Sequence, residues 1–145
     1  MNKLTDYYIC SSFFKKSWEA LNDHERYSGL MAELKAVLCH MGEKKLWQGG
    51  ADDYLVVPPS GRHEGGFIVV RELEGSAPLR EITWPLLLAP RNPDCQGLRV
   101  YWFWKKESTK PILLLVKPVH LKSDFESRDR DLEKKLLAMV SSVEE

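Results

Sequence analysis

The chain has 145 residues, of which 43% are hydrophobic and 29% charged, and its 21 basic side chains balance 21 acidic ones. This length and apolar content argue against disorder and indicate one domain, residues 1–145, with a single core. Zero net charge weighs against a generic nucleic-acid binder, and no apolar run approaches the roughly 20 residues that span a bilayer.

The cysteines and the start of the chain bear on the cellular compartment. Cys10, Cys39 and Cys95 lie far apart and form no CxxC or CxxH pair, which argues against a disulfide framework and against a zinc site. The first residues lack the apolar core of a signal peptide. We therefore expect a cytoplasmic protein with no metal, no cofactor and no membrane partner.

The N-terminal part predicts a short strand and then a helix. Residues 6–10 are β-prone. Ser11 or Ser12 supplies an N-cap for a helix that runs to about Leu21, because a serine hydroxyl can accept a hydrogen bond from the first turn.

A second, longer helix follows a break at residues 22–24. It is expected to run to about Met41 and to end at Gly42, since glycine commonly terminates helices. The short break predicts an antiparallel helix pair. Apolar residues recur along this helix at intervals of three and four, which is the strongest helical signal in the chain: Tyr27, Leu30, Met31, Leu34, Val37, Leu38 and Met41.

The rest of the chain is mostly β-prone until a last helix. Strands are expected at residues 54–57, 66–70, 79–84, 98–105 and 111–120. Successive strands favour an antiparallel meander, whose edge the first strand can join.

A capping box at residues 123–126 predicts the start of the C-terminal helix. Its apolar stripe predicts that the helix docks on the sheet. The expected fold is therefore α+β, with a central antiparallel sheet, two N-terminal helices on one face and a C-terminal helix beside the other.

The hairpin formed by the last two strands carries the most distinctive residues. Alternation places Arg99, Tyr101 and Phe103 on one face, opposite Trp102 and Trp104, which are expected to pack against the N-terminal helices. Residues 99–122 contain six basic side chains against one acidic one, so this hairpin is a basic segment in a neutral chain.

The C-terminal half contains a fixed order of segments. It begins with Leu79-Arg-Glu-Ile82 and Gly97-Leu-Arg-Val-Tyr-Trp-Phe103, and continues with an apolar strand, a Lys/His-bearing turn and a terminal helix. With the strand and the Phe-rich helix at residues 12–21, this order resembles the RelE/ParE toxin superfamily, including its HigB-type members. The resemblance implies a toxin held inactive by a cognate antitoxin. RelE and HigB types cleave messenger RNA in the ribosomal decoding site without a metal.

The resemblance also implies roles for individual residues. Arg99 stands where the family carries an arginine on the open side of the sheet, and it would clamp a phosphate. His120 would supply acid–base chemistry near neutral pH, and Lys122 would add positive charge at the transition state. The residues expected to bind RNA are Arg80, Lys105, Lys106 and Lys117.

Some features favour a different function on the same fold, a ParE-like gyrase inhibitor or a protein–protein adaptor. The chain is neutral, residues 85–96 are additional to the family pattern, and Phe125 lies where many members carry a tyrosine. Arg99 is then an exposed cross-strand partner of Glu81. The aromatic residues on the Arg99 face either stack on bases or pack under the last helix.

Overall fold

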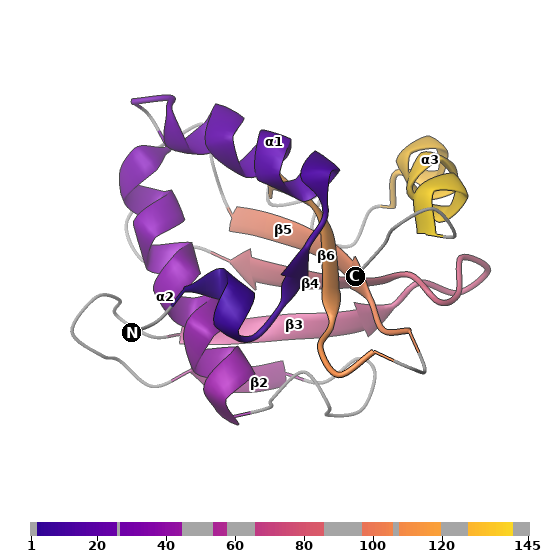
Figure 1. Ribbon diagram of the computed structural model, residues 1–145, viewed down its shortest axis with the longest axis horizontal. Helices are drawn as coiled ribbons and strands as arrows, with labels where there is room; N and C mark the ends of the chain where they lie inside the picture. The colour runs from indigo at the N-terminus through magenta and orange to yellow at the C-terminus, as the bar shows by residue number, and fades with distance from the viewer. Residues whose placement is uncertain are drawn as a thin grey trace.

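The protein has an α+β fold, here described from a computed structural model (Figure 1). The structure describes residues 3–25, 27–44, 54–57, 66–85, 97–105, 108–119 and 128–140. In chain order the elements are η1 (Leu4–Asp6), β1 (Ile9–Cys10), α1 (Ser12–Asn22), α2 (Ser28–Lys44), β2 (Tyr54–Val57), β3 (Gly66–Glu72), β4 (Arg80–Pro85), β5 (Gly97–Phe103), β6 (Ile112–Val119) and α3 (Arg130–Val140).

The strands form one sheet in the order β1-β6-β5-β4-β3-β2. Strands β2 to β6 are an antiparallel meander, and β1 joins β6 in parallel, with Ile9 opposite Ile112. Both the expected meander and the expected place of the first strand at the sheet edge are confirmed.

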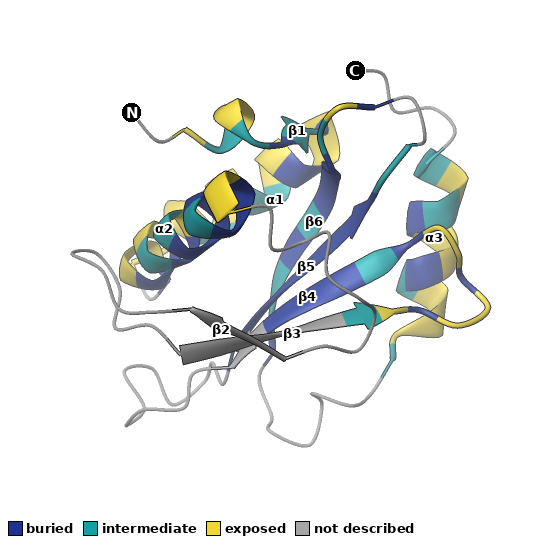
Figure 2. Ribbon diagram, turned by 90° about the horizontal axis from the view of Figure 1, so that it is seen from below, coloured by how far each residue is buried: buried dark blue, intermediate teal, exposed yellow. Residues whose placement is uncertain are grey.

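The helices lie on opposite faces of the sheet, as Figure 2 shows: α1 and α2 cover one face and α3 lies against the other. Every residue of β5 is buried. Val100 and Trp102 pack with α1 and α2, whereas Tyr101 and Phe103 pack with Leu136 of α3. The alternation predicted for this strand is confirmed. None of the described helices is long and apolar enough to cross a membrane.

The ends of two helices are set by side-chain caps. The Oγ of Ser11 accepts a hydrogen bond of 3.0 Å from the backbone N–H of Phe14, so Ser11 is the N-cap of α1. Asp129 caps α3, because its Oδ1 accepts a 3.0 Å hydrogen bond from the N–H of Leu132. The expected start at the capping box is corrected: residues 123–126 lie outside the described residues, and the helix begins at Arg130.

The expected end of the second helix at Gly42 is wrong, because α2 continues to Lys44. Gly42 is buried inside the helix, where Tyr7 crosses it. A Cβ atom on Gly42 would lie 2.4 Å from the Cβ of Tyr7. The glycine therefore permits close packing of the N-terminal segment on α2 rather than terminating the helix.

We predict that Gly42→Ala destabilises the protein by about 1–3 kcal/mol, because the added methyl group overlaps Tyr7. The matched control is Gly29→Ala in the same helix, where a Cβ meets nothing within 4 Å. That variant should gain about 0.5–1 kcal/mol from helix propensity. Urea unfolding followed by circular dichroism measures both, and equal effects of the two substitutions would contradict the packing role of Gly42.

Candidate functional site

Polar side chains from three neighbouring strands come together on the sheet face that carries α3. Each is buried or half-buried, and strand register places them beside one another. We call this set the charge cluster: Arg71, Glu81, Thr83, Arg99 and Tyr101.

Glu81 lies at the centre of the charge cluster and is only 2% exposed. One carboxylate oxygen forms an ion pair with Arg71, and the other lies 3.4 Å from the Nε of Arg99. Burial raises the pKa of the Glu81 carboxyl, and the two guanidinium groups oppose this shift without reversing it. The result is a buried carboxyl group that takes up a proton more readily than an ordinary glutamate.

Arg99 is 4% exposed, and its Nε donates a hydrogen bond of 3.1 Å to the Oγ1 of Thr83. The interpretation that makes Arg99 a cross-strand partner of Glu81 is therefore correct about the partner and wrong about the exposure. In the described conformation the guanidinium group is covered and shares the carboxylate of Glu81 with Arg71.

Tyr101 brings a phenol into the same cluster. Its Oη is buried and has no hydrogen-bond partner among the residues that the structure describes. Burial, and then the negative charge of Glu81, raise the pKa of Tyr101 to about 12, although Arg99 opposes the shift. Tyr101 and Phe103 belong to the apolar cluster that contains Leu136 of α3. These rings therefore pack under the last helix, which is one of the two alternatives that the sequence left open.

A second set of polar residues fixes the first turn of α3 over this face. Glu133 of α3 is completely buried and accepts hydrogen bonds of 2.7 Å from the Oγ of Ser76 and 3.0 Å from the Nε of Arg128. Burial alone would raise the pKa of Glu133, but these hydrogen bonds outweigh it and lower the pKa overall. Glu133 therefore anchors α3 to the turn between β3 and β4 as a carboxylate.

Lys117 is an expected RNA-binding residue that strand register places beside Arg99. It stands opposite Arg99 on β6, is about one-third exposed, and its Nζ lies 4.0 Å from Asp129. Arg99 and Lys117 thus form adjacent positive charges on two central strands.

Arg80 lies on the opposite face of the sheet from Arg99, so the structure does not bring these two expected site residues together. Strand alternation turns it toward the α1 and α2 side, where its Nη2 pairs with Glu72 at 2.9 Å and its guanidinium lies 5.5 Å from the ring centre of Trp102. The described Lys105 is half-buried just after β5.

Three further expected site residues lie outside the described residues: Lys106, His120 and Lys122.

The expected catalytic set did not include Glu81, Tyr101 or Arg71. Alternation along β4 places Glu81 and Thr83 on one face, but it does not say which face carries Arg99. The register between β4 and β5 shows that it is the face of Glu81 and Thr83, since Thr83 stands opposite Arg99 and Glu81 opposite Tyr101. Arg71 belongs to the charge cluster because the pairing of β3 with β4 places it opposite Glu81.

No known protein-family model matches this sequence, and no curated protein is significantly similar to it. A carboxyl group with a raised pKa beside a guanidinium group can remove a proton and stabilise developing negative charge within one site.

We predict that Tyr101 makes the protein lose stability in alkaline solution. A folded-state pKa of about 12 means that the buried phenol keeps its proton after the unfolded chain, with an ordinary value of 10.0, has lost it. The folded state is therefore penalised as the pH rises above 10, by about 1.4 kcal/mol for each pH unit up to about 12.

The Tyr101→Phe variant should lose that part of the pH dependence. Urea unfolding at pH 9 and pH 11 gives the free energies of unfolding of both proteins. Wild type should lose about 1.4 kcal/mol more than the variant over this interval. An identical loss in the two proteins would mean that Tyr101 titrates at its ordinary pKa.

Proposed function

We propose that the protein is the toxin of a toxin–antitoxin pair, a metal-independent endoribonuclease that cleaves messenger RNA, held inactive by an antitoxin. The observation that carries the proposal is the contact between Glu81 and Arg99, with Lys117 opposite Arg99 on the next strand. Supporting it are the order of the elements and the position of Arg99 on the central strand, which agree with the sequence resemblance to RelE and HigB toxins.

The proposed reaction needs a base, a cation and an acid. Glu81 removes the proton from a ribose 2′-hydroxyl, whose oxygen then attacks the adjacent phosphorus atom. Arg99 and Lys117 stabilise the charge on the phosphorus oxygens. The bond from phosphorus to the 5′-oxygen breaks, and His120 or Lys122 gives that oxygen a proton. The products are a 2′,3′-cyclic phosphate and a 5′-hydroxyl group.

RNA reaches Glu81 and Arg99 only if the cover on this face moves, because the two residues are 2% and 4% exposed. Helix α3 packs on this face through Leu136 and Glu133. The proposal therefore includes displacement of α3 when the substrate binds.

The second candidate function is a non-catalytic binding module, a gyrase inhibitor or a protein–protein adaptor. The observation that favours it is that carboxylates of the protein already pair with the arginines at the site. Arg71 and Arg99 are both paired with Glu81, Arg128 is paired with Glu133, and the whole chain is neutral. An RNA-binding surface gains affinity from cations that are available to phosphates.

Expression in a bacterial host tests the leading proposal. Wild type should arrest growth and produce new ends in cellular messenger RNA by primer extension, whereas Arg99→Ala should do neither. The matched control is Arg80→Ala, which removes an arginine from the adjacent strand but on the other face. It should remain toxic and cleave at the same sites.

Folding must be checked, since removing one partner of a buried ion pair can cost about 3–5 kcal/mol. Circular dichroism of each purified variant serves this purpose. Growth arrest without cleavage would point to a protein target such as gyrase. If soluble, folded wild type neither arrests growth nor cleaves RNA, the nuclease proposal fails and the non-catalytic binding module is the function that remains.

We predict further that the cleavage rate depends on the ionisation of Glu81. Because burial raises the pKa of this carboxyl group, the rate should increase with pH until Glu81 is ionised, at a pH above its ordinary value of 4.5. Glu81→Gln keeps the shape of the side chain and should lower the rate about 10²–10⁴-fold.

Single-turnover cleavage of messenger RNA on purified ribosomes, measured across the pH range, gives both quantities. If Glu81→Gln retains the wild-type rate and pH profile, Glu81 is not the base.

A further inference from the structure

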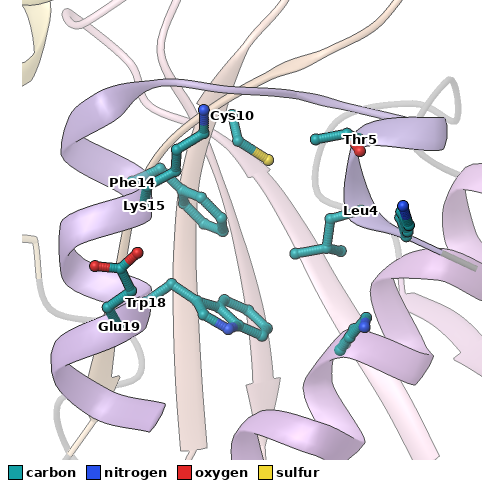
Figure 3. A pocket seen from close by; sticks show the side chains of 9 residues that line it. Leu4, Thr5, Cys10, Phe14, Lys15, Trp18 and Glu19 are labelled. Atoms are coloured by element: carbon teal, nitrogen blue, oxygen red, sulfur yellow. The ribbon is translucent and has the colours of Figure 1, made fainter. Parts of the chain in front are cut away.

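A cleft of about 270 Å³ opens beside the N-terminus, on the α1 and α2 side of the sheet and away from the charge cluster. Four elements border it: η1, β1, α1 and α2. Its apolar surface consists of Leu4, Cys10, Phe14 and Trp18, which Figure 3 shows around the space between α1 and η1. Phe14 is fully buried, whereas the other three are half-buried and remain accessible.

The apolar surface of this cleft is held in a fixed arrangement. The rings of Phe14 and Trp18 lie 5.7 Å apart, and the Ser11 cap holds the start of their helix. On the other side, the Nζ of Lys110 donates a 3.0 Å hydrogen bond to the backbone oxygen of Thr5 in η1. Burial raises the pKa of the Cys10 thiol to about 11, so at neutral pH this residue is uncharged and adds to the apolar surface.

The mouth of the cleft is positively charged. Three exposed lysines line it: Lys3 just before η1, Lys15 of α1 and Lys35 of α2. Among the lining residues they face one carboxylate, that of Glu19. None of the three ammonium groups forms an ion pair with a residue that the structure describes. An apolar depression with a cationic rim is complementary to an apolar group that carries negative charges beside it.

We propose that this cleft binds an acidic peptide segment of a partner protein, which inserts one large apolar side chain between α1 and η1 and places flanking carboxylates on Lys3, Lys15 and Lys35. The size of the cleft suits one aromatic or leucine side chain, the kind of anchor on which peptide interfaces concentrate their binding energy. Because the cleft lies on the face opposite the charge cluster, this inference does not depend on the proposed nuclease activity.

Selection from a displayed peptide library on the immobilised full-length protein tests the proposal. Each peptide carries a fixed central Trp or Phe with random flanks, and the selected sequences should be enriched in Asp and Glu. A selected peptide is then synthesised with a fluorescent label, together with a version in which Lys replaces its acidic residues and one in which Ala replaces its aromatic residue. Fluorescence anisotropy gives the three affinities and their salt dependence.

The decisive variant is Lys15→Glu with Lys35→Glu. It should bind the acidic peptide at least about tenfold more weakly and should prefer the lysine version. The matched control is Lys134→Glu with Lys135→Glu, which makes the same change in net charge on exposed positions of α3. It should bind as wild type does, and Trp18→Ala should weaken binding as much as loss of the peptide's aromatic residue does.

Three results would overturn the proposal. One is selection without acidic enrichment. Another is an equal loss of peptide affinity in the Lys15→Glu/Lys35→Glu variant and in the Lys134→Glu/Lys135→Glu control, which would indicate a general charge effect. The third is unchanged affinity for the peptide that lacks its aromatic residue, since the cleft would then receive no anchor. Circular dichroism of every variant verifies that the fold is retained.

Discussion

Glu81 is held between two guanidinium groups inside the protein, and this arrangement constrains the whole α3 face of the sheet. Removing three charges from water is costly, and the cost is offset only while Arg71, Glu81 and Arg99 stay together. Their contact requires β3, β4 and β5 in one register. A slip of one residue would turn Glu81 toward the apolar layer that contains Ile82 and Val100, where it would have no partner. The ion pairs therefore help to specify which strands pair and how.

The same residues give this face two competing uses. Glu81 and Arg99 have the chemistry of a base and a phosphate ligand, yet both are buried on the face where α3 packs through Leu136 and Glu133. Catalysis would need the contacts of α3 to be weak enough to open, whereas stability needs them to persist. The proposed partner cleft avoids this conflict, because it lies on the other layer and Leu4, Cys10 and Trp18 are accessible in it without any rearrangement. Binding and catalysis would thus be assigned to different faces of one sheet.

The parts of the fold that depend on local chemistry could be predicted from the sequence. Alternation along β5 and the Ser11 cap are of this kind. Gly42 was misassigned because its role comes from Tyr7, thirty-five positions earlier, and helix-end rules do not include such a neighbour. Whether Arg80 or Glu81 shares the face of Arg99 depends on strand pairing, which alternation along one strand does not give. Burial of the charge cluster depends on where α3 docks, and the cleft is assembled from four separate elements, so neither follows from any one stretch of sequence.

The parallel pairing of β1 with β6 also governs the order in which the chain can fold. Ile9 pairs with Ile112, and the hydrogen bond from Lys110 to Thr5 joins residues that are 105 positions apart. During synthesis, α1 and α2 emerge long before β5 and β6, so part of their apolar sides stays uncovered until Val119 has been made. A nascent chain at this stage is open to chaperones and to aggregation. The first strand to be synthesised, β1, can pair only after β6, the last strand, has been made.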